Sequence, residues 1–223
     1  MRIGLLLSAL AASTAACAGD DVVDPPAPHT DVALEFDGLQ IHEQEIAPLR
    51  DYVRSIDGRS GQLTMIGGIL DSFLIPLKLA QRAWPEERAA QRELALGLVS
   101  AVGNEGYPGL VQKGRAVAGE PEAELKTRND LPLPLQAWAF DQQKIGQVSP
   151  VIETPQGFAV ISTYRIIEGR TRDGDTAEVY QVSFYTHGAK AFADWYYAER
   201  TSVAGKVTHV NEDYRRALPP WIR

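Results

Sequence analysis

The clearest alternation of apolar and polar positions lies between residues 157 and 167. Successive side chains of a strand point to opposite faces, so this two-residue period predicts a strand with at least one packed face. The expected faces are Phe158, Val160, Ser162, Tyr164 and Ile166 on one side, and Ala159, Ile161, Thr163 and Arg165 on the other. A strand-like run at 148–154 precedes it, and Pro155 and Gly157 are typical turn residues. The pattern therefore predicts a β-hairpin.

Upstream, apolar residues recur at helical spacing in three stretches, after a short strand expected at 32–36. The first is 42–56. The second, 63–80, is strongly apolar and is expected to be kinked by Pro76, because proline lacks an N–H and its ring meets the preceding turn. The third, 85–102, begins with a proline and two glutamates, which favour a helix start. Its expected apolar stripe is Ala90, Leu94, Leu98 and Val102.

Downstream, residues 179–186 alternate again and predict a third strand beside the second. A simple hairpin register pairs residues whose numbers sum to about 345, which brings His187 near Ala159. Residues 189–201 predict a helix with one aromatic face, typical of core packing. No strand can be placed in residues 108–130. Helices combined with a small antiparallel sheet predict the α+β class.

The composition is that of a globular protein. The chain has 223 residues, of which 44% are hydrophobic and 23% charged. A net charge of −7 argues against nucleic acid as a partner. The four histidines lie far apart with no cysteine or acid at ligand spacing, and no phosphate loop or dinucleotide fingerprint occurs. We therefore expect neither a metal nor a cofactor.

The N-terminus has the pattern of an export signal. Arg2 is followed by an apolar run at 3–12 and then by small residues up to Cys17, the sole cysteine. This looks like a bacterial lipoprotein signal, which implies lipidation of Cys17 and a protein anchored in the cell envelope, facing the periplasm. Thr14 stands where such signals usually have leucine, and the alternative is an ordinary signal peptide with Cys17 incidental. Residues 18–31 are acidic and proline-containing, as expected of a tether.

The stretch 131–167 resembles the C-terminal half of the parvulin family of peptidyl-prolyl cis-trans isomerases. The resemblance covers about 35 residues, with helix, glycine, serine and hairpin at the family's spacing. The residues that carry it are Leu131, Leu135, Phe140, Gly146, Val148, Ser149, Ile152, Thr154, Gly157, Phe158, Val160 and Ile161. It implies a parvulin-like small antiparallel sheet packed by helices, and isomerisation of prolyl bonds in exported or unfolded proteins.

The chain departs from the family at the catalytic histidines. Ala159 occupies the position of one of them, and the strand that carries the other is not found upstream of residue 131. If that strand has been replaced, residues 179–186 are the candidate, and His187 could supply an imidazole. The alternative is that His187 is a solvated histidine at the start of a loop. The catalytic residues are therefore unknown at this stage.

The resemblance also implies a proline-binding pocket. Leu131 and Leu135 map onto it, with Phe140 supporting from the same helix and Phe158 from the hairpin. The alternative is that all four are plain core residues. Because Ala159 stands where the family has a catalytic histidine, the site lacks that polar group. We therefore expect peptide binding to survive better than catalysis.

These inferences give a domain plan and three functional hypotheses. The plan is a signal peptide at 1–16, a tether at 17–31, a helical chaperone-like segment at 32–84, a parvulin-like domain at 85–186, and a C-terminal helix and tail at 187–223 packing on that domain. The hypotheses are an isomerase, a non-catalytic chaperone that binds polypeptides, and an unrelated lipoprotein whose hairpin matches by chance. The expected partners are unfolded or proline-containing polypeptides and, through the lipid, a membrane.

Overall fold

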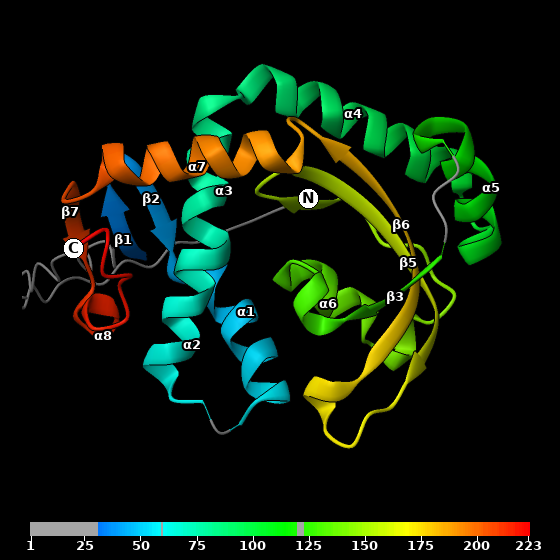
Figure 1. Cartoon of the computed structure of the whole chain (residues 1–223), viewed down its shortest axis with the longest axis horizontal. Helices are drawn as coiled ribbons and strands as arrows, with labels where there is room; N and C mark the ends of the chain where they lie inside the picture. The colour runs from blue at the N-terminus through cyan, green and yellow to red at the C-terminus, as the bar shows by residue number, and fades with distance from the viewer. Residues whose placement is uncertain (1–30, 59, 120–122) are drawn as a thin grey trace, which may run out of the picture. The chain divides into compact units, whose positions relative to one another are not determined.

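The computed structural model describes residues 31–58, 60–119 and 123–223. In these residues helices combine with two small antiparallel sheets, which confirms the α+β class (Figure 1). The signal peptide, the tether up to residue 30 and Cys17 lie outside the described residues.

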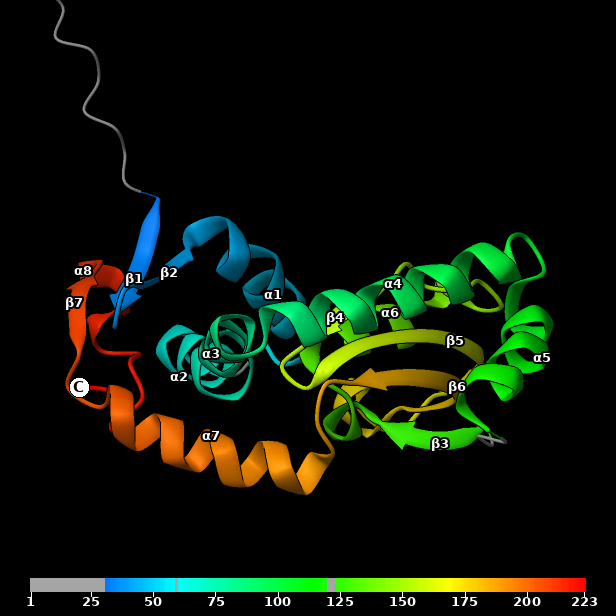
Figure 2. The same ribbon diagram turned by 90° about the horizontal axis from the view of Figure 1, so that it is seen from above.

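The first sheet joins the two ends of the described chain. Its strands are β1 (Val32–Phe36), β2 (Leu39–His42) and β7 (Val207–Val210), in the order β2-β1-β7. The expected strand at 32–36 is confirmed, and it pairs with strands from both ends of the chain (Figure 2).

A layer of helices covers this sheet. It comprises α1 (Glu43–Ile56), α2 (Gln62–Ile69), the π-helical turn η1 (Leu70–Leu74) and α3 (Ile75–Ala83). The π-turn lies just before Pro76, at the position where a kink was expected. Pro76 cannot donate to the carbonyl of Ser72, and a widened turn accommodates its ring.

By length and composition, Gln62–Ala83 is the one helical stretch among the described residues that meets the requirements of a membrane span. Most of it is buried inside the protein, as in a core helix.

The C-terminal segment packs differently from the prediction. Helix α7 (Ala189–Val203) crosses α3, and the tail with α8 (Glu212–Arg215) folds back on α2 (Figures 1 and 2). Side chains from both segments enter one core with the N-terminal helices: Leu34, Phe36, Ile41, Ile66, Leu70, Val203, Tyr214, Leu218 and Ile222 are among its members. The expectation that the tail packs on residues 85–186 is therefore wrong, because the aromatic face of α7 turns toward the 32–84 helices.

The second sheet contains the predicted hairpin. Its strands are β3 (Glu124–Thr127), β4 (Ile152–Thr154), β5 (Gly157–Ile167) and β6 (Thr176–Tyr185), in the order β3-β6-β5-β4. All neighbours are antiparallel. The third strand beside the second is confirmed as β6, and β3 lies within residues 108–130, where the sequence pattern was too weak to place a strand.

Both faces of this sheet are covered. Helices α4 (Pro85–Val102) and α5 (Gly106–Ala118) pack on one face, and α6 (Leu133–Ala139) on the other (Figure 1). Short 3-10 turns lie at η2 (Arg128–Asp130), η3 (Gln142–Lys144) and η4 (Arg172–Gly174). The residues under α4 and α5 include Phe158, Val160, Tyr180, Val182 and Phe184, and those under α6 include Ala159, Ile161, Ala177 and Val179.

Two details of the predicted faces are wrong. The β5 register shifts between Thr163 and Arg165, so Ile166 packs on the α6 side instead of continuing the face of Phe158. In α4, Leu94 is 55% exposed, whereas Arg88 is buried. Leu98 and Val102 of the predicted stripe are buried as expected, whereas the first half of α4 turns Arg88 and Ala95 inward in place of Ala90 and Leu94.

Candidate functional site

The β4–β5 turn, residues 154–157, borders two hollows. It is rigidly built. Gly157 has φ 149°, and a Cβ added there would clash with the carbonyl oxygen of Phe184. The hydroxyl of Thr154 donates to the carbonyl of Gly157 at 3.2 Å. The turn therefore requires glycine at this position.

Arg88 ties this turn to the helices. Its guanidinium donates to the carbonyls of Pro155 at 2.9 Å and Thr154 at 2.8 Å, and to the carboxylate of Glu153 at 3.0 Å. Glu153 also accepts from the Gln81 amide of α3 at 3.1 Å. The turn is thus held against α3 and α4 by charge-assisted hydrogen bonds, which are stronger than neutral ones.

The smaller hollow, of about 270 Å³, lies between this turn, β6 and α6. Its apolar lining includes Leu135, Phe158 and Ala159. Ser183 of β6 stands directly across from Ala159 in the strand pairing, and its hydroxyl accepts a hydrogen bond from Gln181 at 2.7 Å. The hollow thus has an apolar floor, with the hydroxyl of Ser183 and the amide of Gln181 along one edge.

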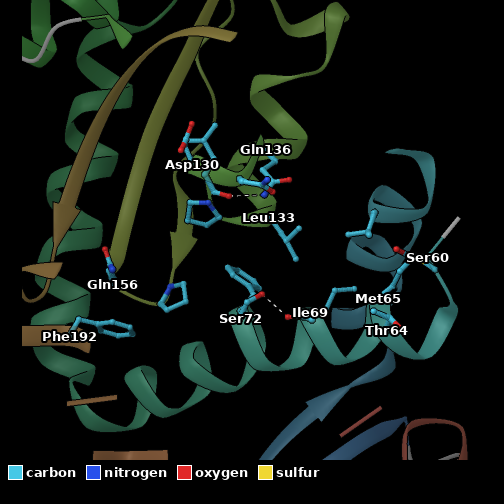
Figure 3. Close-up of a pocket in the computed structure, with 17 residues that line it drawn as sticks. Ser60, Thr64, Met65, Ile69, Ser72, Asp130, Leu133, Gln136, Gln156 and Phe192 are labelled. Atoms are coloured by element: carbon cyan, nitrogen blue, oxygen red, sulfur yellow. Dashed lines mark hydrogen bonds between the residues drawn. The ribbon is translucent and has the colours of Figure 1, made fainter. Parts of the chain in front are cut away.

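The larger hollow, of about 640 Å³, lies between α2 with η1 on one side and α6 on the other (Figure 3). Its apolar lining includes Met65, Ile69, Phe73, Leu131, Leu133 and Phe192. Leu133 points from α6 toward the facing helix (Figure 3). Its polar lining is Ser60, Thr64, Ser72, Asn129, Gln136, Gln156 and Asp130. Asp130, Pro132 and Gln156 line both hollows, so the two adjoin.

Formal charge is sparse in both hollows. Lys126, which lines the smaller one, is ion-paired with Glu124. The carboxylate of Asp130 accepts from the hydroxyl of Thr127 at 2.8 Å and from its N–H at 2.7 Å, and these bonds hold the pKa of Asp130 below its usual range. Among the described residues, no histidine or cysteine lines either hollow. The arrangement is suited to binding and desolvation, and it offers no obvious group for proton transfer at neutral pH.

The residues mapped onto a proline pocket are only partly brought together. Leu135 and Phe158 line the smaller hollow with Ala159, and Leu131 lines the adjoining larger one. Phe140 lines neither; its ring lies 4.1 Å from the guanidinium carbon of Arg128, beside a separate hollow near α1. Leu131, Leu135, Phe140 and Phe158 are all less than 10% exposed, so they belong to the cores as well.

The suggested role of His187 is contradicted by the strand register. Ala159 pairs with Ser183, three residues earlier than the simple hairpin predicts. The shift arises from the irregularity near Tyr164 and the tight 3-10 turn η4 in the connection. The His187 ring instead packs against Trp84, with centroids 4.2 Å apart.

Sequence reasoning missed several residues of the site. Ser183 and Gln181 belong to the alternating run 179–186, and a correct register would have placed them opposite β5. Met65 and Ile69, which line the larger hollow, could not be recognised as site residues from the sequence. Their stretch is apolar throughout, and the helix that faces them, α6, lies far away in the sequence.

Comparisons with protein-family models, with curated proteins and with solved structures find no match to this chain.

Proposed function

We propose that this protein binds extended or unfolded segments of exported polypeptides, as a parvulin-like binding protein of the bacterial envelope. The observation that supports this best is the pair of adjoining hollows, of about 270 Å³ and about 640 Å³, the smaller of which has room for a proline ring and the larger for several side chains. The smaller receives a proline or a similar apolar side chain at Leu135 and Ala159, on the face of the sheet under α6. The larger receives neighbouring residues of the same segment.

The chemistry of the lining favours a polypeptide. Apolar floors remove apolar side chains from water, at about 25 cal/mol per Å² buried. The amides of Asn129, Gln136 and Gln156 and the hydroxyls of Thr64 and Ser72 match the donors and acceptors of peptide groups. A peptide group buried without such partners is costly, so this rim is needed for main-chain binding.

Prolyl isomerisation is a second candidate, supported by the Ser183 hydroxyl facing the apolar floor at Ala159. Rotation about an amide is opposed by about 18–20 kcal/mol. Water exclusion and a polar group that favours the twisted amide both lower that barrier. With alanine at position 159, binding without isomerisation is the better supported activity.

Lipid anchoring at Cys17 completes the proposal. Each buried methylene contributes about 0.8 kcal/mol, so more than one acyl chain gives stable attachment. Cys17→Ser should move the protein from the membrane fraction to the soluble fraction and abolish labelling by a fatty-acid analogue. Unchanged fractionation would contradict the anchor.

Binding is tested by fluorescence anisotropy of a labelled proline-containing peptide and by suppression of aggregation of an unfolded client. Ala159→Phe fills the smaller hollow and should weaken peptide binding by at least about tenfold. Ala90→Phe, on the exposed side of α4, is the matched control and should leave binding unchanged. Circular dichroism checks that both variants fold. Equal affinity of Ala159→Phe and Ala90→Phe would contradict the proposed site.

A protease-coupled isomerisation assay on the same peptide separates the two candidates. Aggregation suppression without isomerisation supports the binding protein. Isomerisation that disappears in Ser183→Ala supports the second candidate.

A further inference from the structure

Helix α2 is bordered by a hollow on each of two flanks. The larger hollow of the candidate site lies on the flank toward α6 (Figure 3). A further hollow of about 480 Å³, the tail hollow, lies on the flank toward residues 216–220 of the C-terminal tail. Met65 and Ile69 line the larger hollow, whereas Leu63 and Gly67 line the tail hollow.

One row of residues on this helical stretch belongs to both hollows. Thr64, Gly68 and Ser72 line the larger hollow and the tail hollow alike. They are spaced four residues apart, so they form a single row along the helix, and all three are exposed. The two hollows therefore adjoin each other across this row.

The row is low enough for an extended chain to pass over it. Gly68 has no side chain, and a Cβ built at this position would have no described atom within 4 Å. The hydroxyl of Ser72 donates to the carbonyl of Gly68 at 2.6 Å, so this side chain lies back along its own helix. The Ser72 oxygen and the Thr64 hydroxyl can bond the peptide groups of a chain that crosses here.

The far wall of the tail hollow is fixed in place. The carbonyl oxygen of Ala217 approaches Gly67 so closely that a Cβ built there would lie 2.8 Å from it. The indole N–H of Trp221 donates to the carboxylate of Asp71 at 2.7 Å, and Leu218 is buried. The tail hollow is therefore preformed, so binding loses little free energy to the ordering of its walls.

The lining of the tail hollow is suited to an apolar side chain. Its apolar members are Leu63 from α2 and Leu218, Pro219 and Pro220 from the tail. Its charged members, Asp71 and Arg216, have opposite signs, so the lining has no net formal charge. A neutral apolar side chain placed here leaves water for an apolar surface, which is favourable.

We propose that the tail hollow is a further subsite of the candidate site and receives a second apolar side chain of the bound polypeptide. This inference rests on the proposed function and adds the length and the apolar spacing of the segments that the protein selects. A helix with its side chains is about 10–12 Å across, and an extended chain advances about 3.3–3.6 Å per residue, so crossing α2 takes about three residues. The selected segments therefore carry a second apolar residue about three positions beyond the one held in the larger hollow.

The experiment compares three acetylated, amidated peptides by fluorescence anisotropy with the full chain. The core peptide has a central proline flanked on each side by valine and then leucine. Two longer peptides add two serines and a phenylalanine, one at the N-terminal end and one at the C-terminal end. We expect one of the longer peptides to bind at least about tenfold more tightly than the core peptide, and the gain to disappear when its phenylalanine is replaced by serine.

Two variants locate the gain in affinity of the longer peptide over the core peptide. Leu63→Asp places a charge in the tail hollow and should abolish the gain, whereas Leu94→Asp, at an exposed leucine of α4, should keep it. Gly68→Leu raises the row and should also abolish the gain, whereas Gly97→Leu, at an exposed glycine of α4, should keep it. Leucine favours a helix more than glycine does, so both glycine variants should fold, which circular dichroism checks.

The outcomes separate this inference from the proposed function. If the core peptide binds and neither longer peptide binds more tightly, the tail subsite is wrong and polypeptide binding stands. A gain that persists in both Leu63→Asp and Gly68→Leu would equally overturn the subsite. If no peptide binds and no client aggregation is suppressed, both proposals are overturned.

Discussion

The clearest quantitative prediction concerns Arg88, which is only 4% exposed in its side chain and fixes the turn at residues 154–157. Replacing it with alanine leaves the carbonyls of Thr154 and Pro155 without the donors they now have. It also leaves Glu153 with the Gln81 amide as its remaining partner. The perturbation is therefore local, and it acts on the turn that borders both hollows.

The expected loss of stability in Arg88→Ala follows from these contacts. Hydrogen bonds to a charged group contribute about 1.5–3 kcal/mol each. Glu153 is 38% exposed, so solvent screening limits its ion pair to under about 1 kcal/mol. The two carbonyl bonds dominate, and we expect Arg88→Ala to lower the free energy of unfolding by about 3–5 kcal/mol. For a domain of this size that lowers the thermal midpoint by about 6–20 °C.

The assay is urea unfolding followed by circular dichroism, with the Arg92→Ala variant as the control. Arg92 lies on the same helix and is exposed, so its removal should change stability by no more than about 0.5 kcal/mol. Arg88→Lys keeps the charge but cannot form the forked bonds, and it should fall between the two. A loss below about 1 kcal/mol in Arg88→Ala would refute the claim that this side chain holds the turn.

Three further predictions test the fold. Gly157→Ala should destabilise the protein by several kcal/mol, about 3 or more, because its Cβ meets the Phe184 carbonyl; full stability in thermal unfolding would contradict the turn geometry. Leu98→Ala should cost about 2–5 kcal/mol and Leu94→Ala under about 0.5 kcal/mol, since Leu98 is 3% and Leu94 55% exposed; equal losses would favour the sequence-based stripe, in which both leucines are buried. Burial raises the pKa of Tyr196, so the stability it contributes is present below the unfolded pKa of about 10 and is lost as pH rises above it. Tyr196→Phe should therefore lose less stability between pH 9 and 11 than the parent chain, as measured by urea titration; an equal loss would contradict this assignment.

Local patterns predicted much of the second sheet. The apolar and β-branched residues around Val160 and the turn residues Pro155 and Gly157 were enough to predict the hairpin, because a short apolar run that begins at turn residues is typical of a buried strand. The bulge near Tyr164 could not be predicted, since a single extra residue carries no local signal. That one residue moved Ile166 to the other face and accounts for one of the three residues by which the register of Ala159 differs from the simple hairpin; the connection accounts for the other two.

For the helices, the sequence pattern did not show which side faces the core. Ala90 and Leu94 fit an apolar stripe as well as the buried residues do, and only the position of the hairpin turn decides which side of α4 faces inward. A buried arginine at position 88 runs against the usual preference for exposure, so composition could not identify it. The candidate site was predicted in part for a similar reason: Leu135 and Phe158 lie on the predicted elements, whereas the α2 wall depends on a long-range packing arrangement.

The pairing of β1 with β7 has a consequence for how the protein forms. Strand β7 is synthesised long after β1, so the first sheet cannot be completed until the C-terminal part of the chain has left the ribosome. Contacts between such distant segments slow folding and leave a strand edge unprotected in the meantime. A chain that is cut short after α7 lacks β7, so β1 keeps β2 as its strand partner and one edge of β1 is left exposed.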